Sequence, residues 1–369
     1  MIPKIAMLSL LALSVALAGC ASPPADPGNK NPTPPTDNPT DPQNNESEEP
    51  QFNVALRTVD ANGTGSEDMG YVFFSTHPFF PGKVMVMAVA KGLAPGPHGF
   101  HVHAGTSCSP TPATNGTAAV PGGAAGGHFN PTNASHGAHA GDLGNLVAGV
   151  DGRAGLVAFT DKLSLDPADP AYIMGRAVVV HRDIDDGVSQ PAGNAGPRVL
   201  CGVIADETTP DPDGFAGAML SVATPNGSGE PVGEAMFIQW DNATWAFAYA
   251  SNLTVGPHGI HVHANGSCDP TPATNTTAAV PAGGAGGHFN PTNATHGQHA
   301  GDLGNLVAGA DGVGTLTILA PGLSLDPASP NYVGDRSVVV HAKADDGVTD
   351  PSGNSGARVL CGIVTSHAE

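Results

Sequence analysis

Gly99-Phe100-His101-Val102-His103 recurs as Gly259-Ile260-His261-Val262-His263, and the two stretches are 160 residues apart. Alternate residues of a β-strand share one face, so the two imidazoles of each stretch point the same way while the apolar residue between them points into the core. A neutral imidazole nitrogen is the commonest metal ligand at physiological pH. Each stretch therefore predicts a strand that presents two metal ligands.

The same period of 160 residues relates two whole sets of six histidines and one aspartate. The first set is His101, His103, His128, His136, His139, Asp142 and His181, and the second is His261, His263, His288, His296, His299, Asp302 and His341. Seven ligands exceed the four that a tetrahedral ion needs, and they serve two four-coordinate ions only if one ligand is shared. The sequence therefore predicts two binuclear metal sites.

Strands and a loop divide the ligands of each set. His181 ends the apolar run of residues 177–180, which is typical of a buried strand. Three imidazoles and one carboxylate from a loop suit zinc, whereas imidazoles held on rigid strands suit copper, whose oxidation state changes. The ligands that we expect in the glycine-rich loop are His128, His136, His139 and Asp142.

Outside the ligands, each copy consists of short β-rich runs without sustained helical periodicity. Clusters of Gly, Pro, Asn and Asp separate the runs, which predicts an all-β sandwich or barrel. Residues 107–127 carry no strand pattern, so we expect a long functional loop there. The predicted strand runs of the first copy are Val54–Val59, Tyr71–Ser75, Val84–Ala90, Leu156–Thr160 and Ala177–His181.

The chain begins with a predicted export signal at residues 1–20. Leu17-Ala-Gly-Cys20 resembles a bacterial lipobox, so we expect lipidation of Cys20. Residues 21–50 are rich in Pro, Asn and acidic residues, which predicts a flexible tether. We expect the protein to be lipid-anchored in the bacterial cell envelope, at the outer membrane. The motif does not indicate whether the protein faces the periplasm or the cell surface.

Two domains of ordinary size account for the remainder, at residues 51–206 and 213–369, joined by a linker at 207–212. Each domain holds two cysteines, and disulfides persist in exported proteins. One bridge within each repeat is the natural pairing, and a pairing across repeats is the alternative. The expected bridges are Cys108 with Cys201 and Cys268 with Cys361.

Charge separates the two domains. The whole chain carries a formal net charge of -20, which argues against nucleic acid or an anionic membrane surface as a partner. Residues 51–206 hold 8 basic and 12 acidic groups, a net of -4, whereas residues 213–369 hold 3 and 13, a net of -10. We therefore expect the second domain to attract small anions less well.

Five motifs of the first copy resemble those of the copper/zinc superoxide dismutase family. They are Gly99-Phe-His-Val-His103, Gly127-His-Phe-Asn-Pro131, His139-Ala-Gly-Asp-Leu-Gly144, Gly175-Arg-Ala-Val-Val-Val-His181 and Gly193-Asn-Ala-Gly-Pro-Arg-Val-Leu-Cys-Gly202. The resemblance covers nearly all of each repeat, and the long loop after Cys108 is similar to the bacterial periplasmic form. It implies two tandem Greek-key β-sandwich/barrel domains that disproportionate superoxide, the small-molecule substrate, to O2 and hydrogen peroxide.

The resemblance also implies a role for each residue, with one copper and one zinc per domain. Copper would be bound by His101, His103, His128 and His181, and by His261, His263, His288 and His341. Zinc would be bound by His128, His136, His139 and Asp142, and by His288, His296, His299 and Asp302. His128 and His288 would bridge the ions and carry a proton, Asp185 and Asp345 would join a copper histidine to a zinc histidine, and Arg198 and Arg358 would attract superoxide.

Some residues depart from this pattern. Asp335 stands where the first copy has Gly175, which would be strained if the position needs a positive φ. His98 and His258 have no ligand position, and we expect them to make structural hydrogen bonds. His77 and His367 have no histidine counterpart in the other copy, and we expect them to be incidental.

Two other functions compete with the enzyme. The scaffold could buffer copper or zinc in the envelope without turnover, or it could act as a spacer at the cell surface. A storage site has no need of Arg198 or Asp185, and a spacer has no need of metal ligands, so both copies favour the enzyme. The sequence leaves open whether the domains pair internally, pair between chains or move independently.

Overall fold

The computed structural model describes residues 51–112, 118–205, 214–274 and 276–366. The predicted signal at 1–20 with Cys20, the tether at 21–50, the linker at 207–212 and His367 lie outside the described residues. Within the described part of the chain, no helix has both the length and the apolar character to cross a membrane.

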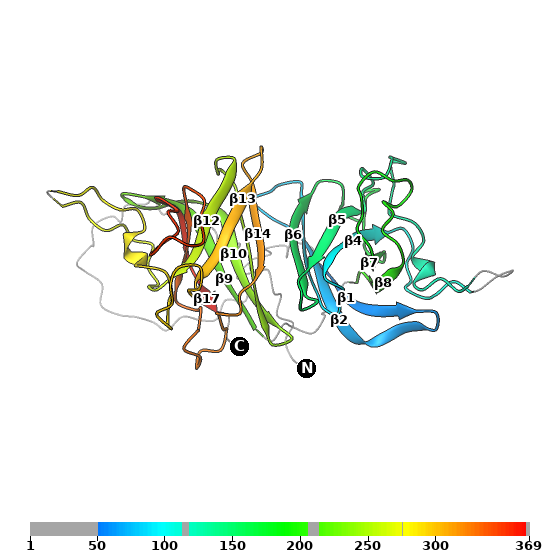
Figure 1. The fold of residues 1–369 in the computed structure, drawn as a ribbon. Coiled ribbons are helices and arrows are strands. Elements are labelled where there is room, and N and C mark those ends of the chain that lie inside the picture. The colour runs from blue at the N-terminus through cyan, green and yellow to red at the C-terminus, as the bar shows by residue number, and fades with distance from the viewer. Residues whose placement is uncertain (1–50, 113–117, 206–213, 275, 367–369) are drawn as a thin grey trace, which may run out of the picture. The chain divides into compact units, whose positions relative to one another are not determined.

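The first copy folds into a closed antiparallel barrel with the strand order β1-β2-β3-β6-β5-β4-β7-β8 (Figure 1). Neighbours that are distant in sequence, such as β3 beside β6 and β4 beside β7, give the crossed connections of a Greek key. The elements are β1 (Gln51–Asp60), β2 (Gly63–Thr76), β3 (Val84–Ala90), β4 (Gly96–His103), the 3₁₀-helix η1 (Gly123–Ala125), β5 (Asp142–Ala148), β6 (Ala154–Thr160), β7 (Ala177–His181) and β8 (Arg198–Val203).

The second copy repeats this topology in the order β10-β11-β14-β13-β12-β15-β16-β9, and the pairing of β9 with β10 closes the barrel. Its elements are β9 (Gly214–Thr224), β10 (Gly227–Trp240), β11 (Ala243–Ala250), β12 (Gly256–His263), the 3₁₀-helix η2 (Gly283–Ala285), β13 (Asp302–Ala308), β14 (Gly314–Leu319), β15 (Ser337–His341), β16 (Arg358–Ile363) and the short β17 (Thr365–Ser366). The all-β prediction is confirmed.

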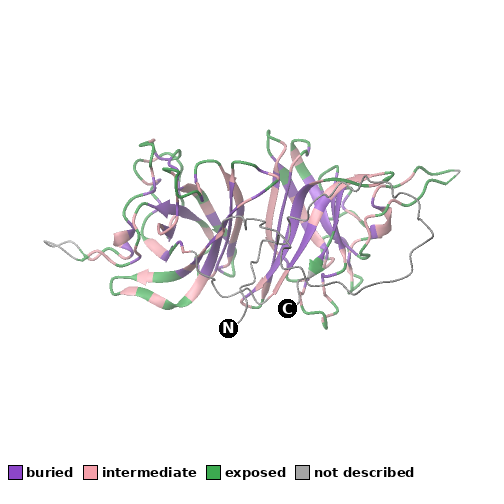
Figure 2. Ribbon diagram, turned by 180° about the vertical axis from the view of Figure 1, so that it is seen from behind, coloured by how far each residue is buried: buried purple, intermediate pink, exposed green. Residues whose placement is uncertain are grey.

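Each barrel encloses its own apolar core. Along β1 the buried residues alternate with more exposed ones, which places Phe52, Val54 and Leu56 in the barrel interior. In the second barrel, Phe237 and Leu220 lie in the corresponding interior cluster. Buried residues follow the strands and exposed ones follow the loops (Figure 2). The cores therefore fix the strands of each barrel.

A disulfide ties the long loop of each copy to the barrel. Cys108 bonds Cys201 on β8, and Cys268 bonds Cys361 on β16, so the pairing within each repeat is confirmed. Each bridge spans 93 residues, a loop whose closure stabilises the fold by about 4 kcal/mol in the chain-entropy model. The described parts of residues 107–127 contain only η1 and one isolated bridge, which confirms the predicted loop.

Candidate metal centres

Two neighbouring strands and one loop residue build the first ligand group. His101 and His103 lie on β4, which pairs with β7 so that His103 is opposite Ala177. His181 ends β7, and His128 reaches the group through an isolated backbone bridge to His103. One ring nitrogen from each of the four histidines lies within 4.8 Å of the other three. The strand register thus brings four imidazoles to one point.

A second group lies on the other side of His128. Its members, His128, His136, His139 and Asp142, also offer atoms within 4.8 Å of one another. Asp142 Oδ1 lies 2.8 Å from His128 Nδ1, 3.4 Å from His136 Nδ1 and 3.3 Å from His139 Nδ1. Asp142 is the first residue of β5, so the expectation of a loop position is wrong for this ligand. The strand fixes the carboxylate about which the loop histidines gather.

His128 belongs to both groups through different ring nitrogens. Its Nδ1 faces Asp142, while its Nε2 is buried without a hydrogen-bond partner among the described residues. In the second barrel His288 repeats this, with Nδ1 2.8 Å from Asp302 Oδ1 and Nε2 unpartnered. An imidazole has only these two donor atoms, so one ring can serve two ions at once.

The second barrel repeats both ligand groups with all seven side chains. Atoms of each group again lie within 4.8 Å of one another. The first group is His261, His263, His288 and His341, and the second is His288, His296, His299 and Asp302. The structure therefore brings together every residue that the sequence predicts as a ligand.

Buried ring nitrogens without partners test whether these groups fit metal ions. A buried polar atom without a hydrogen bond is costly and rare, and a metal ion removes that cost. Among the described residues, such atoms concentrate in the two ligand sets. They are Nδ1 of His101, His136, His139, His261 and His296, and Nε2 of His128, His263, His288 and His341. Nitrogen and carboxylate donors of this kind fit copper and zinc.

Asp185 links the two ligand groups of the first barrel by contacting one histidine of each. Its Oδ2 lies 2.6 Å from His101 Nε2 and its Oδ1 lies 2.8 Å from His136 Nε2. Both imidazoles can donate from Nε2 to this carboxylate, which leaves each Nδ1 as a free electron pair. Asp345 makes the same two contacts, at 2.8 Å each, with His261 and His296.

Burial keeps the ligands in the form that binds metal. Burial, with the charge of His128 as a smaller cause, lowers the pKa of His101 to about 3. Burial also lowers the pKa of His181 to about 4 and that of His341 to about 3. These imidazoles are therefore neutral at pH 7. Burial acts to raise the pKa of Asp142, but the His128 contact and other hydrogen bonds outweigh it and the pKa falls.

An arginine lies beside the first group of each barrel. Arg198 on β8 donates from Nη1 to Gly122 O at 2.7 Å and from Nη2 to Gly126 O. Gly126 O also lies 2.9 Å from His103 Nδ1, so one carbonyl holds both the arginine and a histidine of the ligand group. Arg358 is held by the equivalent carbonyls. The guanidinium is thus a fixed cation at the site.

Three histidines outside the ligand groups have other surroundings. His98 places its ring nitrogens 2.9 Å from His181 O and 2.7 Å from Ala94 O, and His258 has the corresponding contacts. Their expected structural role is confirmed. The expectation that His77 is incidental is wrong, because His77 is buried and its Nε2 contacts Tyr249 Oη. A glutamate inside the apolar run of β10, Glu234, is the sequence signal for this contact.

Comparison with known proteins agrees with this geometry. The family model for copper/zinc superoxide dismutase matches the chain twice, at residues 69–204 and 232–364. A superoxide dismutase [Cu-Zn] from Deinococcus radiodurans is 38% identical over 146 residues, which cover 37% of this chain and 78% of the relative. Superoxide dismutase [Cu-Zn] 2 from Brassica juncea is 42% identical over 147 residues, covering 37% and 88%.

A solved structure titled Cu/Zn superoxide dismutase from Brucella abortus aligns with 34% identity and a TM-score of 0.36, covering 40% of this chain and 98% of its own. The two matches to the family model together span more than half of the chain. The chain therefore belongs to the copper/zinc superoxide dismutase family.

Proposed function

We propose that each of the two domains, residues 51–206 and 213–369, disproportionates superoxide at its own binuclear copper/zinc site. The observation that carries the proposal is the pair of opposite nitrogens on His128 and on His288, each nitrogen facing a separate ligand group. The family match and the names of the relatives support the activity.

The donor atoms support a division between the two ions. Copper suits the strand-borne groups of four imidazoles, which are His101, His103, His128 and His181, and His261, His263, His288 and His341. Zinc suits the groups of three imidazoles and one carboxylate, which are His128, His136, His139 and Asp142, and His288, His296, His299 and Asp302.

Two superoxide anions and two protons give one O2 and one hydrogen peroxide. When bound, copper supplies the one-electron exchange, and zinc holds the shared imidazole and adjusts its basicity. The fixed guanidinium of Arg198 attracts and orients the anion. His128 Nε2 has no hydrogen-bond partner among the described residues, so this atom, when it is not bound to copper, can take up a proton and deliver it to the second oxygen species.

Asp185 acts on the ligands and not on the substrate. Its two contacts hold His101 and His136 with Nδ1 toward the metals, so it sets the direction of one ligand in each group. A protein that only stores metal needs neither this link nor Arg198. The metal-buffering function is therefore the weaker candidate.

We also propose a site of action, on the basis of the N-terminal motif. We place the protein in the bacterial cell envelope, held by a lipid on Cys20, in the outer membrane and facing the periplasm or the cell surface. The two disulfides support an oxidising compartment. Labelling of the protein with a fatty acid in cells, lost in Cys20→Ala, is the expected result; equal labelling of both forms would contradict the anchor.

Metal analysis of the purified chain, combined with a dismutation assay, tests the proposed activity. We expect about two copper and two zinc ions per chain and dismutation that a copper chelator removes. Zinc without copper, or full metal content without dismutation, would leave a metal-binding protein instead of an enzyme.

A further inference from the structure

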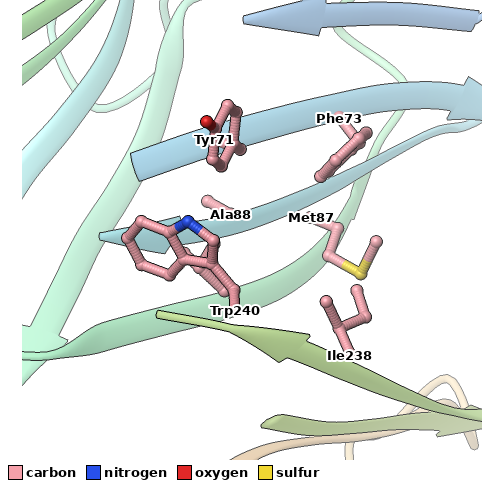
Figure 3. Close-up of a pocket in the computed structure, with 7 residues that line it drawn as sticks. Tyr71, Phe73, Met87, Ala88, Ile238 and Trp240 are labelled. Carbon is pink, nitrogen blue, oxygen red and sulfur yellow. The ribbon is translucent and has the colours of Figure 1, made fainter. Parts of the chain in front are cut away.

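The outward face of β3 is as buried as its inward face. Met85, Met87 and Val89 alternate with residues of the barrel core, yet they are 0%, 1% and 4% exposed. When only one face of an antiparallel sheet is packed against a core, the other face is exposed to water. Here Ile238 and Trp240 from β10 of the other barrel cover the face (Figure 3). The covering surface thus belongs to the same chain, and residues 50–369 form one compact unit.

Strand register identifies the equivalent residues of the two faces. Gly70 is opposite Ala90 in the first barrel and Gly233 is opposite Ala250 in the second, so these pairs correspond. The pairing of β5 with β6 and of β13 with β14 extends the correspondence. The equivalent residues, first barrel first, are Tyr71 and Glu234, Val89 and Tyr249, His77 and Trp240, Gly155 and Thr315, Lys91 and Ser251, and Arg153 and Val313.

Gly155 lies at a tight contact between the barrels. A Cβ atom at this position would lie 2.6 Å from Cζ3 of Trp245 and 2.8 Å from Cγ2 of Thr317, both in the second barrel. Only glycine fits there. The equivalent residue of the second barrel is Thr315, so a second copy of that barrel, docked in place of the first, would drive a threonine side chain into Trp245.

A buried chain of hydrogen bonds closes one end of the interface. Phe79 N donates to His77 Nδ1 at 3.3 Å, so the proton of His77 lies on Nε2 and is donated to Tyr249 Oη. Tyr249 Oη in turn donates to the fully buried carboxylate of Glu234. Burial and the nearby Glu234 raise the pKa of Tyr249 well above its ordinary value, so the phenol keeps the proton it donates. A second copy of the second barrel would offer Trp240, a larger side chain, instead of the imidazole.

Charges of opposite sign meet at the other end. Asp241, in the turn between β10 and β11, lies 3.2 Å from Lys91 Nζ and 2.8 Å from Arg153 Nη2 of the first barrel. The equivalents of these two cations are Ser251 and Val313, which carry no charge. Two copies of the second barrel would leave Asp241 without a cation, and two copies of the first would leave both cations without Asp241.

We propose that the two barrels of one chain pair with each other through this face, and that the face accepts the unlike barrel while it rejects a second copy of either. Shape, a buried hydrogen-bond chain and charge all favour the unlike pair. The inference concerns assembly alone and does not depend on the proposed activity. It predicts that a chain uses its own second half as its dimer partner and leaves this face closed to other chains.

Cleavage of the linker in the folded full-length protein tests the pairing. A protease site placed within residues 207–212 is cut after purification, and native mass spectrometry and size-exclusion chromatography are run at micromolar concentration. We expect one complex with one copy of each half, and we expect no complex of two identical halves. Separated halves, or complexes of identical halves, would overturn the proposal.

Substitutions at Gly155 and at its equivalent, Thr315, test whether the close contact at Gly155 sets the preference for the unlike barrel. Gly155→Thr is expected to weaken the cut complex about tenfold or more because the new side chain meets Trp245. Threonine favours a strand over glycine, so this change does not weaken the first barrel itself, and an unchanged far-UV circular dichroism spectrum checks this. Thr315→Gly, at the equivalent position, is the matched control and should leave the halves paired. Equal affinity of the Gly155→Thr and unaltered halves would sink the idea.

A third variant does not involve the fit of side chains. Asp241 has a φ of 51°, which asparagine also adopts readily, so Asp241→Asn removes the charge and keeps the turn. The halves should bind severalfold less tightly at low salt, and the loss should disappear at high salt because the ion pairs are partly exposed. An affinity equal to that of the unaltered halves at low salt would contradict a role of these ion pairs in the pairing of the barrels.

Discussion

The two barrels carry the same set of candidate metal ligands in different electrostatic surroundings. Both hold seven ligands, a linking aspartate and an arginine fixed by two carbonyls. Residues 51–206 have a net charge of -4, however, whereas residues 213–369 have -10. Part of the difference lies at the loop that bears the zinc-type ligands, where His136 N donates to Gln190 in the first barrel and His296 N donates to Asp350 in the second.

This comparison shows which features of the two sites are the same and which differ. The linking aspartate and the strand register are the same in both barrels, because they set the direction of the ligands. The side chain that accepts from the loop backbone changes from an amide to a carboxylate, because either oxygen satisfies the N–H group. Charge near the site is therefore free to vary, and the two barrels should differ in the rate of substrate capture more than in metal binding.

Removal of the linking aspartate should have the largest effect and should be equal in the two barrels. Asp185→Ala and Asp345→Ala release one ligand in each group, and we expect a loss of about 10- to 100-fold in the metal affinity of the altered barrel. Competition titration against a chelator measures it. Asp183→Ala is the control, because Asp183 pairs with Arg182 at the surface instead of linking a histidine of each ligand group. A different loss in the two barrels would break the equivalence of the sites.

Removal of the arginine should lower the capture rate while the metals stay bound. Arg198→Ala or Arg358→Ala deletes the fixed cation, and we expect a loss of about tenfold in kcat/KM of the altered barrel. The assay uses chains in which the other barrel has been silenced by His288→Ala or His128→Ala, respectively. Metal content should stay unchanged, since the guanidinium is no ligand. A loss of metal together with activity would make the arginine a structural residue.

Ionic strength should reveal the charge difference directly. We expect the first barrel, assayed in His288→Ala, to capture superoxide severalfold faster at low salt than the second barrel, assayed in His128→Ala. The two rates should converge near 1 M salt, where the screening length is about 3 Å. Equal rates at low salt would mean that the net charge of a barrel does not affect the rate at which its site captures superoxide.

The smallest expected effect concerns one backbone position. Asp335 has a φ of 58° where Gly175 has 76°, so the second barrel holds an aspartate in a left-handed conformation. Asp335→Gly should stabilise that barrel by at most about 1 kcal/mol, and Gly175→Asp should destabilise the first barrel by a similar amount. Denaturant unfolding of the metal-free chains measures both. A destabilising Asp335→Gly would show that the side chain contributes more than the strain costs.

Much of the fold and the site could be predicted from the sequence, because local pattern and ligand chemistry agree. The apolar run of residues 177–180 followed by His181 indicates β7 by itself, and the doubled ligand spacing requires a shared imidazole. β5 escaped prediction because its residues 142–148 alternate weakly and begin with a ligand aspartate. Only the folded register shows that Asp142 starts a strand.

The contact between the barrels could not be predicted because the sequence marks Glu234 as unusual but does not show which residues contact it. His77 has no histidine counterpart, and Glu234 interrupts an apolar strand without any local partner. They meet at Tyr249, which lies far from His77 in the chain and contacts both, and His77 Nε2 also lies 3.4 Å from Glu234 Oε2. Long-range partners of this kind leave no spacing signal.

The activities of two single-site variants test most directly whether each barrel holds a complete and independent centre. His128→Ala removes the shared ligand of the first barrel, and His288→Ala that of the second. We predict that each variant loses about one copper per chain and that the dismutation rates of the two variants add up to the rate of the unaltered chain. Complete loss of activity in either single variant, or no loss in one of them, would contradict the account.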